Sequence, residues 1–150
     1  MKQKVRLEHQ KIMKIYRVKN RSMEPYLHSD DLILAKRWNC PKRGHILLIN
    51  PQIASQRLNI KRLIGLPGDR ITIKEGSLWL NGRYLAEPYL KGNPASPLKM
   101  HREWVVPEET FFVLSDNRIL GTEDSRYYGP IPIRYIKYHM TMRIWPLIRS

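Results

Sequence analysis

The segment Ser22-Met23-Glu24-Pro25 places a serine hydroxyl directly after a β-like stretch, residues 15–18. At a junction between a strand and a turn, a side chain can project into a groove. A serine hydroxyl becomes an effective nucleophile only when a neighbouring base accepts its proton. The same tetrapeptide is also typical of a serine that opens a turn or a short helix before a proline. Ser22 is therefore a candidate nucleophile that needs a base.

Lys61 is the candidate base, because none of the five histidines lies in a segment with a triad signature. It lies in the apolar, β-like run 58–64, where alternation turns Lys61 inward if Ile60 and Arg62 face the other way. Burial disfavours the ammonium form, and the charge of Arg62 acts in the same direction, so both lower the pKa of Lys61 from about 10.4. A neutral amine can then act as a general base. The ordinary alternative is a lysine that reaches water along an edge strand.

A third group of polar residues follows later in the chain, as Ser115-Asp116-Asn117-Arg118 and then the run 122–130. Its hydroxyl, carboxylate and guanidinium groups could support a catalytic pair. Taken alone, the group is also typical of a polar loop held by Asp–Arg ion pairs.

The elements that must position these residues are short and β-rich. Alternating or β-branched runs recur from Lys14 onward, at residues 15–18, 32–35, 46–49, 58–64, 71–73, 78–80, 111–114 and 135–145. Turn signals separate them, at residues 41–44, 67–69, 75–77 and 81–82. The pattern predicts an all-β fold built from hairpins, with little helix.

The length of 150 residues suits one domain with a real core and is too short for two. Residues 1–14 are predicted to be a basic, flexible N-terminal lead. Residues 15–150 are predicted to form a single catalytic β domain. Within it, the Pro- and Lys-rich region 84–107 is expected to be an irregular insertion.

Charge is the outlier of the composition, since 27 Lys and Arg against 13 Asp and Glu give a net charge of +14. Such a body is attracted to nucleic acid or to an anionic membrane surface. Cys40 is the only cysteine, which excludes an internal disulfide and a cysteine-based metal site. No pattern predicts a metal or an organic cofactor. The longest apolar runs fall far short of the roughly 20 residues that span a bilayer, and no export signal precedes them, so the printed sequence would start in the cytoplasm.

The three groups of polar residues, in this order, resemble the motifs of the type I signal peptidases. The family motifs read S-M-x-P, then K-R-x-x-G-x-P-G-D, then G-D-N-R…S-x-D-S-R-x-x-G, and the resemblance covers roughly Val18 to Pro130, including the Asn81-Gly82 turn. It implies an antiparallel β barrel or sandwich and a cofactor-free serine endopeptidase with a Ser-Lys dyad. Such enzymes remove signal peptides from preproteins after small residues at positions −1 and −3.

The resemblance also implies a role for each matching residue. Ser22 would be the acylated nucleophile and Lys61 its base, with Thr122 supplying a hydroxyl that orients the amine. The backbone N–H of Ser22 and the side chain of Asn20 would form the oxyanion hole. Asp124 would pair with Arg62 or with Arg126, so these three residues would support the site.

The sequence departs from the family motifs at several of these places. Five residues rather than four separate Arg118 from Asp124, so the match of Thr122 is made from the Asp-Ser-Arg end. Residues that differ in type from those usual in the family stand at Asn20, Tyr26, Asp30 and Ser115, and Asp31 matches the second residue of the Gly-Asp pair that the family has there.

The resemblance further implies a membrane-associated protein with its catalytic domain outside the cytoplasm and preproteins as substrates. The basic surface and the apolar stretch 144–148 would dock on anionic lipid. Two other functions stay open: a soluble peptidase that matures one dedicated precursor, as for nickel superoxide dismutase, and a basic β domain that stacks bases on Trp79 and Tyr84. Binding of nucleic acid is not expected, and the oligomeric state is unknown.

Overall fold

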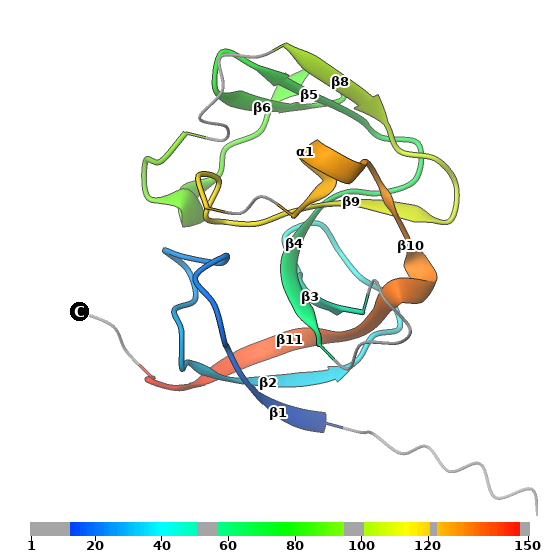
Figure 1. Ribbon diagram of the computed structural model, residues 1–150. Helices are drawn as coiled ribbons and strands as arrows, with labels where there is room; N and C mark the ends of the chain where they lie inside the picture. Colours follow the sequence, from blue (N-terminus) through cyan, green and yellow to red (C-terminus); the bar gives the residue numbers. More distant parts are fainter. Residues whose placement is uncertain (1–12, 51–56, 95–100, 121–122, 148–150) are drawn as a thin grey trace, which may run out of the picture.

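Two antiparallel β-sheets make up the protein in the computed structural model, which describes residues 13–50, 57–94, 101–120 and 123–147 (Figure 1). The larger sheet has the strand order β1-β2-β11-β3-β4-β9-β10. Its strands are β1 (Met13–Arg17), β2 (Leu32–Arg37), β3 (Ile46–Ile49), β4 (Asn59–Gly65), β9 (Thr110–Leu114), β10 (Ile131–Pro132) and β11 (Ile136–Trp145).

The smaller sheet has the order β7-β6-β5-β8 and lies at the top of Figure 1. Its strands are β5 (Arg70–Lys74), β6 (Ser77–Leu80), β7 (Arg83–Tyr84) and β8 (Arg102–Val105). The described helices are short: α1 (Ser125–Tyr128) and the 3-10 turns η1 (Pro88–Leu90) and η2 (Ile133–Tyr135). None of the helices in the described ranges is long and apolar enough to cross a membrane. The predicted all-β architecture with little helix is confirmed.

Burial on both faces explains why the central strands read as continuous apolar runs. All four residues of β3 are buried, and so are the last four of β9. Strand β5 alternates instead, with Ile71 and Ile73 buried between more exposed neighbours. One apolar cluster joins the two sheets, and its buried members are Ile64, Ile71, Ile73, Leu78, Val106, Phe112 and Leu114.

The hairpin between β6 and β7 follows its turn residues. Asn81 and Gly82 form the two-residue loop, and both have positive φ angles, of 52° and 79°. Two successive positive φ values define the tight turn whose twist matches that of paired strands, and Asn-Gly is the residue pair that adopts it most readily. The turn predicted at residues 81–82 is therefore present.

Two segments are more regular than the sequence suggested. Strand β1 begins at Met13, inside the lead predicted for residues 1–14, and residues 1–12 lie outside the described ranges. Strand β8 lies inside the region 84–107 that was expected to be irregular, and it pairs with β5. Trp104 on β8 packs against Phe112 with ring centroids 5.1 Å apart. Apolar contact with the core thus recruits this short strand despite its Pro- and Lys-rich surroundings.

The two sheets approach each other closely at Gly65. A Cβ atom at this position would lie 3.0 Å from Ile71 Cδ1, 3.0 Å from Phe112 Cβ and 3.1 Å from Val106 Cγ2. We expect Gly65→Ala to lower the free energy of unfolding by about 1–3 kcal/mol, because the added methyl overpacks a closed core. Urea unfolding measures the change.

A double-mutant cycle identifies the cause of that loss. Ile71→Val removes the Cδ1 atom that Gly65→Ala would press against, so the alanine should cost less in that background than in the wild type. A Gly65→Ala protein with the urea midpoint of the wild type would contradict the close approach.

Candidate active site

Lys61 lies in the middle of β4 with only 4% of its surface exposed. Its Nζ donates a hydrogen bond to the Ser115 hydroxyl over 2.8 Å. The neighbouring Arg62 is also buried, and its guanidinium binds a different residue, Asp116. The inward orientation predicted for Lys61 is present, and the ordinary alternative of a lysine reaching water is not.

The environment of Lys61 favours its neutral form. Burial is the largest influence and lowers the pKa of the amine below its ordinary value. The carboxylates of Asp124 and Glu123 raise the pKa in part, and the guanidinium of Arg126 lowers it again. The adjacent Arg62, which the sequence suggested as a cause, is not among these influences. The net result is an amine that gives up its proton more easily than a surface lysine.

Ser22 lies in the turn that follows β1, between side chains that anchor the loop in the core. Val18 before it and Met23 and Leu27 after it are almost completely buried. A backbone hydrogen bond of 2.8 Å from Leu27 to Met23 closes the turn. The loop is thus held in place on both sides of Ser22, whose own side chain stays partly exposed.

Asn20 faces Ser22 with its amide oxygen. Both the backbone N–H of Ser22, at 3.0 Å, and its hydroxyl, at 2.7 Å, donate to Asn20 Oδ1. Because a backbone N–H requires an acceptor, the atom that faces it is the oxygen and not the NH2 group. The donor role predicted for Asn20 therefore needs its side-chain amide to rotate. The other predicted oxyanion donor, the Ser22 backbone N–H, already donates to Asn20 Oδ1.

The segment after β9 connects the two candidate catalytic residues. The backbone N–H of Asn117 donates to the Ser22 carbonyl over 2.9 Å, and its side-chain amide donates to the Arg21 carbonyl over 3.1 Å. Two residues earlier, Ser115 accepts the hydrogen bond from Lys61. No hydrogen bond joins Ser22 directly to Lys61 within the described ranges. The serine loop and the lysine are instead bound to the same short segment.

Asp124 binds the segment after β9 through the backbone of Ser115. Its buried carboxylate accepts from the Ser115 backbone N–H at 3.0 Å and from Arg126 Nη2 at 2.9 Å. It also accepts from the Arg126 backbone N–H, which makes it the N-cap of α1. Of the two partners considered for Asp124, the structure pairs it with Arg126. Thr122 lies outside the described ranges.

Arg62 joins the loop that carries Ser22 to the strand that carries Lys61. Its Nε and Nη2 bind the two oxygens of Asp116 at 2.8 and 2.6 Å, and its Nη1 donates to the Gly44 carbonyl at 2.9 Å. The guanidinium carbon lies 4.8 Å from the ring centroid of Tyr26 and 3.8 Å from that of Tyr89. Both stacking and bidentate pairing need the planar guanidinium of arginine.

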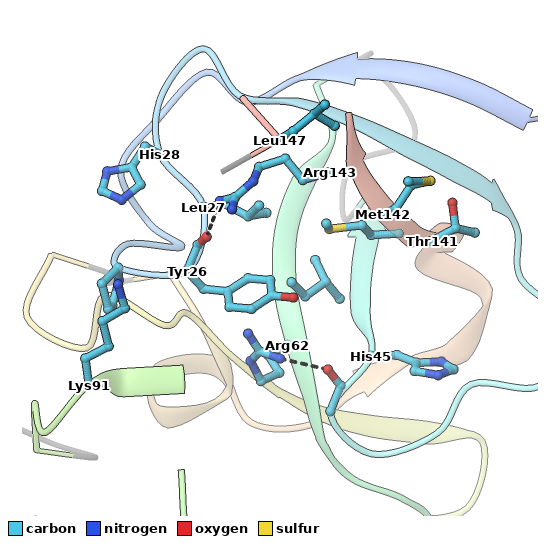
Figure 2. A pocket seen from close by; sticks show the side chains of 14 residues that line it. Tyr26, Leu27, His28, His45, Arg62, Lys91, Thr141, Met142, Arg143 and Leu147 are labelled. Atoms are coloured by element: carbon cyan, nitrogen blue, oxygen red, sulfur yellow. Dashed lines mark hydrogen bonds between the residues drawn. The ribbon is translucent and has the colours of Figure 1, made fainter. Parts of the chain in front are cut away.

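A cleft of about 1060 Å³ opens beside these residues. Figure 2 shows the Tyr26 ring next to Arg62, with Arg143 above it and donating to the Tyr26 carbonyl over 3.2 Å. Among the described residues that line it, none is acidic, and the basic side chains are His28, His45, Arg62, Lys91 and Arg143. Neither Ser22 nor Lys61 lines the cleft, so it adjoins the candidate site without containing it.

Comparison with known proteins identifies the family. The model of the family described as signal peptidase, peptidase S26, matches residues 7–145. The chain belongs to this family. The resemblance found in the sequence motifs is thus confirmed. None of the described residues forms a group of three or more His, Cys, Asp or Glu that could hold a metal ion.

Named signal peptidases are similar to most of this chain. A probable signal peptidase I-2 of Synechocystis is 38% identical over 140 residues, which are 85% of this chain and 61% of that protein. Signal peptidase I of Bacillus caldolyticus is 32% identical over 146 residues, 87% of this chain and 79% of that protein. The chain thus spans less than two thirds of the length of the Synechocystis relative.

A solved structure supports the same assignment. The crystal structure of a signal peptidase I from Enterococcus faecalis V583 is similar with a TM-score of 0.57 and 31% sequence identity. The match covers 69% of this chain and 98% of that one. The antiparallel β architecture is therefore that of the signal peptidases.

Sequence reasoning missed several contacts between residues of the candidate site. Asp116 was read as part of a motif but not as the partner of Arg62. The contact of Ser115 with Lys61 had no signal beyond a departure from the family motif. The stacking of Tyr26 and Tyr89 on Arg62 joins residues that are far apart in the chain, so spacing alone gave no indication of it.

We expect Arg62→Met to lower the free energy of unfolding by about 3–5 kcal/mol, because it leaves the buried carboxylate of Asp116 without its partner. Combining it with Asp116→Leu should recover most of the loss. The measurement is urea unfolding of the two single variants and the double variant.

The exposed pair of Arg70 and Glu103 supplies the matched control. Arg70→Met removes the same charge from a position whose side chain is 57% exposed, and it should cost about 1 kcal/mol or less. Equal losses for Arg62→Met and Arg70→Met would contradict the role assigned to burial.

Proposed function

We propose that this chain is a serine endopeptidase of the signal peptidase I type, with Ser22 as nucleophile and Lys61 as general base. The observation that carries the proposal is the buried amine of Lys61, which is bonded to a neutral hydroxyl on the segment that also binds the Ser22 loop. An amine bonded to a carboxylate would stay protonated. The names of the related proteins support the same activity.

In the proposed reaction the neutral Nζ of Lys61 accepts the proton of the Ser22 hydroxyl as its oxygen attacks the scissile carbonyl carbon. The resulting ammonium donates that proton to the leaving amine, and the peptide bond breaks to leave an ester on Ser22. A water molecule then attacks the ester while Lys61 accepts its proton. Breakage of the ester returns the proton to Ser22 and releases the acid.

The tetrahedral intermediates carry negative charge on the former carbonyl oxygen. The proposed donors to this oxygen are the Ser22 backbone N–H and the NH2 group of Asn20. Turning the Asn20 amide would free the backbone N–H and bring its own NH2 group toward the oxyanion. Loss of one such donor typically costs about 10²-fold or more in rate.

The open edge of β4 offers a place for an extended substrate. Strand β9 pairs with β4 only from Arg62 onward, whereas residues 59–61 pair with β3 alone among the described strands. Half-buried Tyr16, Leu58 and Ile60 pack against the adjoining apolar cluster. A peptide that adds to this edge as a strand would gain backbone hydrogen bonds and run toward Lys61. We propose that signal peptides bind here and are cut after small residues at positions −1 and −3.

The first test is cleavage of a preprotein with an Ala-x-Ala site by the full chain in detergent or lipid. Ser22→Ala and Lys61→Ala are each expected to lower kcat/KM by about 10³-fold or more, since the nucleophile and its base act as a unit. Lys61→Arg should be equally inactive, because a guanidinium does not release its proton. The wild-type rate should fall with decreasing pH as Lys61 becomes protonated, at a pH below the pKa of about 10.4 of an ordinary lysine.

Ser29→Ala and Lys36→Ala are matched controls, because both residues are exposed and neither belongs to the proposed machinery. Both should cleave at the wild-type rate. Retention of activity by Ser22→Ala or Lys61→Ala would overturn the dyad. Wild-type protein that cuts none of several Ala-x-Ala sites in lipid would favour the peptidase for one dedicated precursor.

We also propose that the protein acts at an anionic membrane surface, with its catalytic domain outside the cytoplasm as the family resemblance implies. Trp145, the last residue of β11, is 64% exposed, and Leu147 two residues after it is 70% exposed. Exposed apolar side chains next to a strongly basic body suit the boundary between anionic headgroups and acyl chains.

Sedimentation with phosphatidylglycerol vesicles tests the membrane proposal. Wild-type protein should bind at low salt and dissociate as salt rises, and Trp145→Ser with Leu147→Ser should weaken binding several-fold. Tyr84→Ser, at an exposed position of the other sheet, is the control and should bind like the wild type. Binding that does not respond to salt or to lipid charge would contradict the proposal.

A further inference from the structure

Ser115 stands at a position where the family motif has glycine, and its side chain is completely buried. Its hydroxyl is the acceptor of the 2.8 Å hydrogen bond from Lys61 Nζ. This is the one hydrogen bond that the Lys61 amine makes within the described ranges. The Ser115 side chain, which the glycine of the family motif lacks, therefore accepts the hydrogen bond of the Lys61 amine.

The backbone of Ser115 is fixed on both sides. Its N–H donates to Asp124 Oδ2 over 3.0 Å, and its carbonyl accepts from Arg118 Nε over 2.6 Å. Both partners are buried and are held in turn, Asp124 by Arg126 and Arg118 by Glu87. With the backbone fixed in this way, the position of the Ser115 hydroxyl depends only on rotation about one side-chain bond.

Asp124 does not replace Ser115 as the partner of the amine. Its carboxylate oxygens are occupied by the Ser115 backbone and by Arg126, so it acts on Lys61 through its charge. Charge alone does not fix the direction of an amine lone pair. A hydrogen bond does, because the N–H that points to Ser115 constrains where the rest of the amine can point.

We propose that Ser115 is a positioning residue for Lys61, whose hydroxyl directs the lysine lone pair toward Ser22. This inference rests on the proposed function of Ser22 and Lys61. The Ser115 oxygen accepts an N–H of Lys61 in the neutral and in the protonated state, so the contact persists through both proton transfers of the reaction. The hydroxyl acts through Lys61 and does not touch the substrate.

Ser115→Ala tests the proposal in the full chain on the preprotein substrate. We expect kcat to fall about 10- to 100-fold with KM unchanged. The Lys61 lone pair would no longer be oriented toward Ser22, whereas the edge of β4 proposed to bind the substrate would be intact. The acid limb of the pH–rate profile should move to lower pH, because the buried ammonium loses an acceptor that stabilised it. Ser115→Thr, which restores the hydroxyl, should recover the acid limb of the wild type.

Two more variants separate positioning from folding. Ser115→Gly removes the hydroxyl and introduces the residue of the family motif, so it should reproduce the effects of Ser115→Ala even if that variant folds poorly. Ser125→Ala is the matched control: Ser125 is equally buried, and its hydroxyl accepts from the Val113 backbone N–H over 2.9 Å. Loss of this hydroxyl should lower stability but leave the acid limb in place.

A titration without substrate distinguishes failure of this inference from failure of the proposed function. The measurement is the pH dependence of the Lys61 Cε signal by NMR in protein with ¹³C-labelled lysine, with and without Ser115→Ala. A lower Lys61 pKa in the variant supports the inference even if the wild type cleaves no preprotein. A Lys61 titration that is the same in Ser115→Ala as in the wild type would overturn the inference. If the wild type cleaves the preprotein, a Ser115→Ala variant with the same kcat and the same pH–rate profile would also overturn it.

Discussion

The burial of one lysine amine is the constraint on which the rest of this site depends. An ammonium group is costly to remove from water, so a strand places lysine inside only where neighbouring groups compensate. In this protein Lys61 is buried on strand β4 of the larger sheet, with a hydroxyl at hydrogen-bond distance and with charges of both signs around it. Folding free energy is thus used to bury an amine whose pKa lies below that of an ordinary lysine.

Three buried ion pairs connect the segments that make up the candidate site. The pair of Arg62 and Asp116 joins strand β4 to the segment after β9. The pair of Asp124 and Arg126 joins that segment to α1. Arg118 with Glu87 joins it to the region before η1. Because each pair satisfies its own charges, Lys61 is left with a neutral partner. A buried polar network therefore connects the segments of the site.

The sequence was sufficient for the β architecture, because short alternating runs and turn residues such as Asn81-Gly82 are local signals. Alternation along β4 also allowed an inward Lys61 but did not decide it, because Arg62 on the opposite face is buried as well. It was insufficient where tertiary contacts decide. Strand β8 packs against the core through the contact of Trp104 with Phe112. Arg62 pairs with Asp116 and not with Asp124 because the fold brings β4 next to the segment after β9. The orientation of the Asn20 amide depends on one rotation that no pattern in the sequence specifies.

The open edge of β4 has a second consequence, for the behaviour of many copies in solution. An unpaired strand edge accepts any extended chain, including the same edge of another molecule, and such pairing is a common route to aggregation. The net charge of +14 opposes it, because like-charged bodies repel before their edges meet. Salt weakens this repulsion beyond a distance of about 8 Å at physiological ionic strength. The excess of lysine and arginine thus opposes self-association through the part of β4, residues 59–61, that pairs on one side only among the described strands.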